Sequence, residues 1–187
     1  MLEIKEYEDT KITREIAEPI GVLCARSFKD SQRSLEERVN EMLSFNGSQD
    51  PEHTTGRRYV IWQGQRVIAH ARTFVRQVFV ADEPLSVLAL AAVCSDPDMR
   101  GQGLGVRVTQ AAFQRVNQNG WPQVSLFQTP VPEFYKKLDC RLVDNQFVNR
   151  RNVSDPNANP WRDPNVMIYP AEFDWRSGLV DMNGPDY

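Results

Sequence analysis

The sequence predicts an α/β (α+β) fold in which helices flank a mixed, mostly antiparallel sheet. Two amphipathic helical patterns come first, and several runs of β-branched and aromatic residues follow them. One pair of these runs is separated by a tight turn, whereas a later pair is separated by a helical pattern that begins near Gly103. A tight turn pairs strands antiparallel and a helical crossover pairs them parallel, so we expect both pairings in one sheet.

The length and composition are those of one ordinary domain. The chain has 187 residues, of which 41% are hydrophobic and 25% charged, as is typical of a protein with a packed core. The sequence contains neither internal repeats nor a Pro/Gly-rich linker that would divide it. We therefore expect a single domain over residues 1–187.

Helices are expected near the start of the chain. Over residues 13–28, apolar residues recur at steps of three and four. A second helix fits residues 34–43, where Ser34 and Glu37 have the spacing of a capping box. The segment 45–56 contains Gly, Asn, Asp and Pro and predicts a loop.

Strands dominate the middle of the chain. Residues 57–63 and 66–80 predict a hairpin, and residues 86–95 (SVLALAAVCS) are apolar almost throughout, as in a strand covered on both faces. Helices and strands then alternate. We expect a helix over 103–117, a strand over 123–128, a short helix over 132–138, an extended stretch over 140–153 and a last strand over 166–170.

Charge, cysteine count and the N-terminal sequence argue against several classes of protein. The net charge of −3 gives no basic field for DNA or RNA. No apolar run is long enough to cross a bilayer, and the N-terminus lacks the apolar stretch of a signal peptide. Three separated cysteines and two histidines offer neither a disulfide framework nor a metal-binding motif. We expect a cytoplasmic protein with no metal, no nucleic-acid partner and no membrane contact.

The strongest functional signal is a glycine-rich turn, Arg100–Gly105 (RGQGLG), between an apolar strand and an amphipathic helix. Glycines let the backbone approach a ligand closely, and the unpaired amides at the start of a helix attract anions. Arg100 adds a guanidinium suited to phosphate oxygens. The turn therefore predicts a phosphate or pyrophosphate site.

The spacing of the glycines narrows the ligand. Val106 and Val108 stand where a dinucleotide fingerprint needs its third glycine, and the turn has no lysine, which a P-loop requires. Arg100, Gly103 and Gly105 instead match the pattern [RQ]-x-x-G-x-[GA], so the chain resembles the Gcn5-related N-acetyltransferase (GNAT) superfamily. This resemblance implies acetyl-CoA, or another acyl-CoA, as cosubstrate. The implied pyrophosphate-binding residues are Arg100, Gly101, Gln102, Gly103, Leu104 and Gly105.

The resemblance to the superfamily covers residues 1–170. The end of the chain resembles only particular members of it. PEFYKKLDCRLV is similar to the second half of the family, although Leu138-Asp139-Cys140 departs from its LGF-like turn. Residues 166–187 resemble the ends of aminoglycoside 2′-N-acetyltransferases and of nodulation N-acyltransferases. The regions implied are N-terminal helices and a hairpin (1–80), an acyl-CoA-binding βαβ core (86–143), and C-terminal strands with a tail (144–187).

The resemblance also implies catalytic roles. Backbone groups of Val93, Cys94 and Ser95 would polarise the thioester carbonyl, and Tyr135 would return a proton to the departing thiolate. Because Cys94 would lie beside the acyl group, it could be interpreted as a catalytic nucleophile. We interpret Cys94 as a packing residue, because an apolar strand raises the pKa of a thiol.

The sequence offers several candidates for the base that takes the proton of the amine. Some relatives carry a glutamate in the first half of the central strand, but residues 86–92 contain no acid. The candidates are Glu83 just before that strand, His70 on the neighbouring strand, Glu133 near Tyr135, and a chain of waters.

These features predict an acetyl-CoA-dependent N-acetyltransferase that acts on a primary amine of a small, cationic molecule. Acidic residues in the early helices and in the tail favour a cationic acceptor. Two alternatives stay open, namely a catalytically silent acyl-CoA-binding sensor and a peptide or protein N-acetyltransferase. A homodimer is compatible with the sequence.

The C-terminal tail is expected to dock on the rest of the protein. Phe173 and Trp175 are large aromatic residues that are costly to leave in water. We expect residues 181–187, with the terminal carboxylate, to reach toward the acceptor cleft, where negative charge would hold a cationic amine and accept its proton. A purely structural clasp is the alternative.

Overall fold

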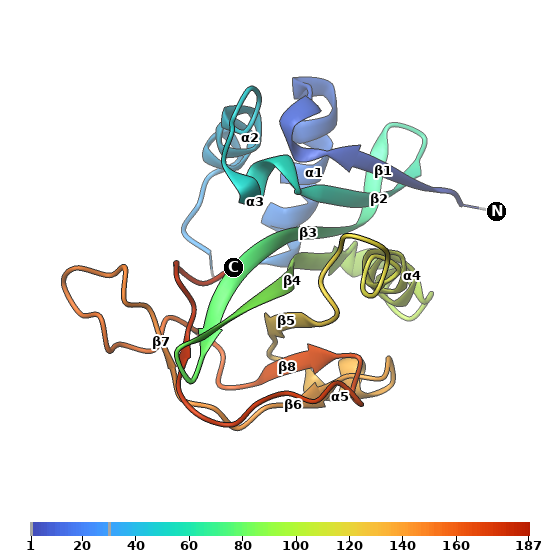
Figure 1. Cartoon of the computed structure of the whole chain (residues 1–187). Helices are drawn as coiled ribbons and strands as arrows, with labels where there is room; N and C mark the ends of the chain where they lie inside the picture. The colour runs from blue at the N-terminus through green and yellow to red at the C-terminus, as the bar shows by residue number, and fades with distance from the viewer. Residues whose placement is uncertain (1, 30) are drawn as a thin grey trace. The chain divides into compact units, whose positions relative to one another are not determined.

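A computed structural model describes residues 2–29 and 31–187 (Figure 1). The chain forms two compact units, and each unit combines two stretches of sequence. Unit 1 consists of residues 1–74 and 90–114, and unit 2 of residues 75–89 and 115–187. Two long strands, β3 (Arg66–Val80) and β4 (Glu83–Ser95), run from one unit into the other, so neither unit is a contiguous segment.

Unit 1 contains the strand order β1-β2-β3-β4. Strand β2 (Arg57–Gln63) pairs antiparallel with β3 across the predicted turn, which confirms the hairpin. Strand β1 (Ile4–Glu8) pairs antiparallel with β2 and was not predicted. Its sequence, IKEYE, has only two apolar residues, so the pairing with β2 rather than a local pattern determines it.

The helices of unit 1 begin and end close to their predicted positions. Helix α1 spans Arg14–Ser27 and α2 spans Leu35–Ser44. The predicted capping box is present, since the Ser34 amide donates to Glu37 Oε2 at 2.6 Å and the Glu37 amide donates to Ser34 Oγ at 3.2 Å. The predicted loop over 45–56 contains a short helix, α3 (Pro51–Thr54), whose first turn is capped by the preceding aspartate.

The core of unit 1 lies between the helices and the strands. Figure 1 shows α1 and α2 beside each other, and buried residues of both pack against β2, β3 and β4. The cluster consists of Ile12, Ala17, Ile20, Leu23, Cys24, Val39, Met42, Val60, Val67 and Cys94. Helix α4 (Leu104–Phe113) contacts β2 and ends four residues before the predicted position.

Unit 2 contains the strand order β3-β4-β5-β8-β6. Strand β5 (Ser125–Gln128) pairs parallel with β4, as a helical crossover requires, and antiparallel with β8 (Val166–Tyr169). Helix α5 (Pro132–Lys136) follows β5. The extended stretch predicted over 140–153 forms two short strands, β6 (Arg141–Leu142) and β7 (Phe147–Val148).

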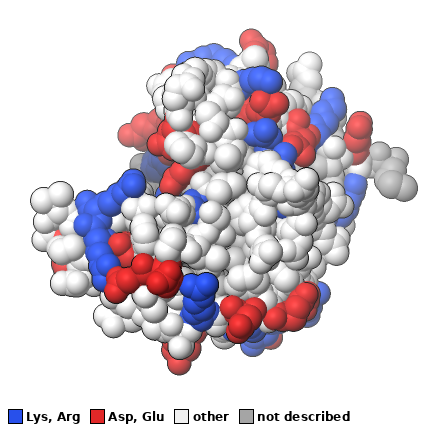
Figure 2. Space-filling model, in the orientation of Figure 1, with Lys and Arg blue, Asp and Glu red and all other residues white. Residues whose placement is uncertain are grey.

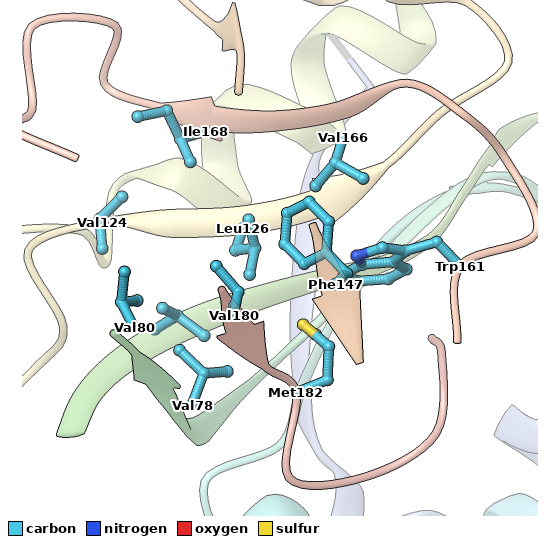
Figure 3. Close-up of a cluster of buried hydrophobic side chains, with 11 residues drawn as sticks. Val78, Val80, Val124, Leu126, Phe147, Trp161, Val166, Ile168, Val180 and Met182 are labelled. Carbon is cyan, nitrogen blue, oxygen red and sulfur yellow. The ribbon is translucent and has the colours of Figure 1, made fainter. Parts of the chain in front are cut away.

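A short final strand, β9 (Val180–Asp181), closes unit 2. It pairs antiparallel with β3 and parallel with β7. The cluster in Figure 3 joins Val180 and Met182, both fully buried, to Trp161 and to residues of β3, β5, β7 and β8. The C-terminal residues are therefore part of the core of unit 2. The mixed, mostly antiparallel sheet flanked by helices is confirmed.

Charged side chains of both signs are interspersed on the face seen in Figure 2. Within residues 2–29 and 31–187, no helix is both long and apolar enough to cross a bilayer.

Candidate functional site

The end of β4 has an irregular backbone. Ala92 has a φ of +49°, which an alanine adopts only when its surroundings enforce it. The Ala92 carbonyl accepts a hydrogen bond from His70 Nδ1 at 2.8 Å, because a carbonyl can only accept. His70 therefore supports the strand at the point where Val93, Cys94 and Ser95 begin.

His70 itself is fully buried. With Nδ1 donating to Ala92, Nε2 is the acceptor that faces Arg58 Nη1 at 3.3 Å. Burial, together with the Arg58 guanidinium, lowers the pKa of His70 from 6.5 to about 3, so the ring is neutral. A buried, neutral imidazole with both nitrogens engaged is poorly suited to take a proton from a bound amine.

A buried aspartate anchors the turn that follows β4. The turn begins with a 3-10 helix, η2 (Pro97–Met99), capped by Asp96 Oδ1, which accepts from the Asp98 amide at 3.0 Å. Arg26 donates to Asp96 Oδ2 at 2.7 Å, and Arg66 pairs with the same oxygen. Burial alone would raise the pKa of Asp96, but the Asp98 amide and the two guanidinium groups outweigh it and lower the pKa.

The glycine-rich turn has the backbone that the sequence predicts for an anion site. Gly101 and Gly103 have φ values of +80° and +72°, in the left-handed region that favours glycine. Gly103 is the N-cap of α4, and residues 100–103 are exposed. A Cβ atom at Gly101 or Gly103 would meet no heavy atom within 4 Å, so the space above the backbone is open. An anion can therefore reach the start of α4.

The thiol of Cys94 is buried, with 8% of the residue exposed. The same region holds Cys24 of α1 and His70, and the ligand atoms of the three lie within 4.8 Å of one another. The pKa of Cys94 is well above its usual value because of its contact with Cys24 and its burial. The raised pKa disfavours Cys94 as the nucleophile of an acyl transfer, and the contact with Cys24 was not predicted.

The predicted acid, Tyr135, lies on α5 in unit 2. Its side chain is 6% exposed and its ring packs against Phe127 of β5, with centroids 4.6 Å apart, and edge-on against Phe134. Glu133, two residues earlier, pairs with Lys136 at 2.6 Å. Glu83 is exposed at the first residue of β4.

The tail is bound to unit 2 as predicted. Trp175 Nε1 donates to Asn145 at 2.8 Å, and Phe173 and Trp175 pack on the core of that unit. Tyr187 donates its hydroxyl to the Leu126 carbonyl at 2.8 Å. These contacts show that the tail packs on unit 2, and its role toward an acceptor stays a prediction. No sequence pattern indicated its strand β9, because that strand depends on pairing with distant residues.

Aromatic and charged contacts hold the last residues. The Arg76 guanidinium lies over the Tyr187 ring, 4.9 Å from its centroid, and donates to the Pro185 carbonyl at 2.5 Å. Asp186 pairs with Arg162 at 2.8 Å and accepts from Gln128 of β5 at 3.4 Å. The acidic group expected to meet a cationic substrate therefore already has cationic and polar partners.

Residues 11–143, which are more than half of the chain, match the family model of an acetyltransferase (GNAT) domain. The chain belongs to the GNAT acetyltransferase family. The match spans α1 to the residues after α5 and thus includes the glycine-rich turn and Tyr135. The narrower resemblance of residues 166–187 stays a prediction, because the family match ends before them.

Solved structures show the same fold. The GNAT N-acetyltransferase YhbS of Escherichia coli, solved in complex with CoA, is 21% identical with a TM-score of 0.61, over 97% of this chain and 91% of that one. An acetyltransferase from Brucella melitensis in complex with acetyl-CoA has 11% identity and a TM-score of 0.53, over 75% and 84%.

Some similar structures are much longer than this chain. A GNAT protein from Kribbella flavida is 20% identical, with a TM-score of 0.57 over 75% of this chain. The chain spans only about a third of that protein, since 33% of it is covered. No curated protein matches the chain.

Proposed function

We propose that the protein transfers an acetyl group from acetyl-CoA to a primary amine of a small, cationic molecule. The observation that carries the proposal is the structure of unit 1 from Ala92 to α4. A strained strand end, a turn fixed by buried Asp96, and left-handed glycines in front of a helix follow one another along the chain. This arrangement supports the assignment of a pyrophosphate site beside a thioester site.

In the proposed complex, the pyrophosphate accepts hydrogen bonds from amides of residues 101–105. The exposed side chain of Arg100 adds a charge-assisted hydrogen bond, while Gln102 and Leu104 contribute their backbone. The thioester carbonyl is polarised by backbone groups of Val93, Cys94 and Ser95. The open space above Gly101 and Gly103 supports this assignment, because a side chain there would occupy it.

The proposed reaction is direct transfer. The neutral amine attacks the thioester carbon, a C–N bond forms, and the C–S bond breaks as the tetrahedral intermediate collapses. Tyr135 donates its hydroxyl proton to the departing thiolate, and the proton of the amine leaves to a base. The products are an N-acetylated amine and free CoA, so no oxidant or reductant is needed.

The base is proposed to be solvent or an exposed carboxylate. His70 is a weak candidate, since its ring is buried and its pKa is about 3. Glu83 is exposed and can exchange protons with water. Asp186 and the terminal carboxylate remain proposals, and the ion pair of Asp186 with Arg162 must loosen before Asp186 can serve.

A screen of acceptors tests the proposal. Purified protein is incubated with acetyl-CoA and with polyamines, aminoglycosides or proteome-derived peptides, and the release of free CoA thiol is followed with a thiol reagent. Product mass then gives the acetylated molecule. We expect release of CoA with a small polycationic amine. Binding of acetyl-CoA without release for any acceptor would indicate a sensor, and acetylation of peptides alone would indicate a peptide N-acetyltransferase.

A further inference from the structure

Two cysteine thiols from different elements face each other inside unit 1. Cys24 on α1 and Cys94 on β4 are 7% and 8% exposed, and both are free thiols. Their sulfur atoms lie within 4.8 Å of each other. The remaining cysteine, Cys140, belongs to unit 2 and donates to the Leu138 carbonyl at 3.6 Å.

Neighbouring contacts hold the two thiols in this position. Ser27, one turn beyond Cys24, donates to the Ser95 carbonyl at 3.4 Å. Arg26 pairs with the buried carboxylate of Asp96 at 2.7 Å. The last turn of α1 thus contacts three successive residues at the end of β4 and just beyond it, so the two sulfur atoms meet in the folded state with a high effective concentration.

The surroundings shift the pKa values of the two thiols in opposite directions. A hydrogen bond from Cys94 lowers the pKa of Cys24 in spite of burial, and the guanidinium groups of Arg58, Arg38 and Arg33 lower it further. The same contact and burial raise the pKa of Cys94. Cys24 is therefore the better nucleophile at neutral pH, and Cys94 is placed to react with it afterwards.

His70 completes the surroundings without joining the reaction. Its Nδ1 is bonded to the Ala92 carbonyl and its Nε2 faces Arg58. Both ring nitrogens of His70 therefore already have partners, which leaves the two thiols as the reactive groups of this cluster.

We propose that Cys24 and Cys94 are a redox pair, which a hydroperoxide oxidises to a disulfide that links α1 to β4. The Cys24 thiolate attacks one peroxide oxygen, so that an S–O bond forms, the O–O bond breaks and hydroxide or alkoxide leaves. Cys94 then attacks the Cys24 sulfur, the S–S bond forms, and the oxygen leaves as water. In sum, two thiols and one hydroperoxide give a disulfide, an alcohol or water, and a second water.

The disulfide would act on the proposed acyl-CoA site, and this consequence rests on the proposed function. Cys94 lies between Val93 and Ser95, whose backbone groups are proposed to hold the thioester. A sulfur–sulfur bond is shorter than 4.8 Å, so its formation draws α1 and the end of β4 together and alters the backbone around Cys94. We expect the oxidised protein to bind acetyl-CoA more weakly than the reduced protein.

Mass spectrometry of the native protein tests the pair. Folded, reduced protein is treated with one equivalent of hydrogen peroxide, quenched with N-ethylmaleimide, digested without reductant and mapped. We expect a loss of two hydrogens and a linked peptide pair containing Cys24 and Cys94, in wild type and in Cys140→Ser alike. The proposal is overturned if both thiols stay alkylatable while Cys140 reacts, if pairs with Cys140 are as frequent, or if a stoichiometric bound metal protects the thiols.

Variants separate the two steps of the reaction. Cys94→Ala should accumulate a Cys24 sulfenic acid that a dimedone probe labels, whereas Cys24→Ala should give little labelling of Cys94. Circular dichroism confirms folding, and Cys→Ser versions replace any alanine variant that fails to fold. Acetyl-CoA affinity is measured separately by calorimetry. A disulfide with unchanged affinity would refute the link to the acyl site, and reduced protein that never binds acetyl-CoA would refute the proposed function instead.

Discussion

At the scale of single residues, the glycine-rich turn depends on backbone angles that only glycine adopts readily. Gly103 has a φ of +72° and is the residue immediately before α4. A substitution at Gly103 would both strain the backbone and cover the proposed pyrophosphate site. The same substitution at Gly47 serves as a control for the strain alone. Gly47 is also exposed, has a φ of +74° and has open space around it, but it lies in a turn after α2.

Gly103→Val should abolish or greatly weaken acetyl-CoA binding. A valine there is strained by about 1–2 kcal/mol and covers the amides proposed to bind the pyrophosphate. Gly47→Val should cause a similar loss of stability with normal binding. Calorimetric titration and thermal unfolding measure the two effects. Equal acetyl-CoA affinity in Gly103→Val and the parent would remove the turn from the site.

Tyr135→Phe tests the proposed proton donor. The ring and its contact with Phe127 are kept, so folding and acetyl-CoA affinity should change little. Loss of a general acid should lower kcat by about 10²-fold. Tyr169→Phe, in β8 of the same unit, serves as the control and should retain full activity. An unchanged kcat in Tyr135→Phe would leave Tyr135 as a packing residue.

At the scale of elements, strand β4 needs support from its neighbour to keep its irregular end. The positive φ of Ala92 costs conformational energy, and the hydrogen bond from His70 on β3 offsets it. His70 is in turn adjacent to Arg58, whose Nε pairs with the buried carboxylate of Asp9 at 2.7 Å. The strand end next to the proposed thioester site is therefore shaped by a buried histidine on the neighbouring strand.

His70→Leu should destabilise the protein and weaken acetyl-CoA binding. It leaves the half-buried Ala92 carbonyl without this partner, which costs about 1 kcal/mol or more. His70→Asn should restore part of both properties, because its amide N–H stands near the position of Nδ1. Urea unfolding measures the stability, and calorimetry measures the acetyl-CoA affinity. If leucine and asparagine bind acetyl-CoA as well as histidine, the strand end does not depend on residue 70.

The same histidine predicts a pH dependence of stability. In the folded state His70 stays neutral down to about pH 3, whereas in the unfolded chain it takes up a proton below about pH 6.5. As the pH falls between these values, the unfolded state binds more protons, so the free energy of unfolding decreases. In His70→Asn the decrease over this range should be smaller than in the parent, as measured by urea unfolding at several pH values.

At the scale of the whole molecule, the C-terminal residues belong to the architecture. Val180 and Met182 are fully buried in unit 2, and Tyr187 packs edge-on against Trp161 with centroids 5.0 Å apart. A role of the tail toward the acceptor therefore cannot be separated from folding by removing the tail. Substitution of one charge is the cleaner test.

Truncation after Gly178 should destabilise the protein severely. Loss of one large buried aliphatic side chain costs about 2–5 kcal/mol, and the truncation removes two such residues together with β9. Asp186→Asn leaves this core intact and should keep the thermal midpoint close to that of the parent. A raised KM for a cationic acceptor in Asp186→Asn would support an acceptor role, and a folded, stable truncated protein would contradict the clasp.

The sequence determined the features that depend on neighbouring residues. The capping box of α2, the Gly64–Gln65 hairpin turn and the glycine-rich turn before α4 were all predicted, because their geometry is set within a few residues. Two apolar runs joined by a helix likewise predicted the parallel pair β4–β5. The glycine-rich turn was enough to predict the family, which the family match confirms, whereas acetyl-CoA as cosubstrate stays a prediction.

Only the tertiary structure decided the features that join distant segments. Strands β1 and β9 are formed by pairing, and their own sequences carry too few apolar residues to show it. The partners of Asp96, the burial of His70 and the contact between Cys24 and Cys94 each depend on how α1, β3 and β4 pack. Side-chain periodicity shows which face of an element is buried, but it does not show which residue of another element will lie opposite.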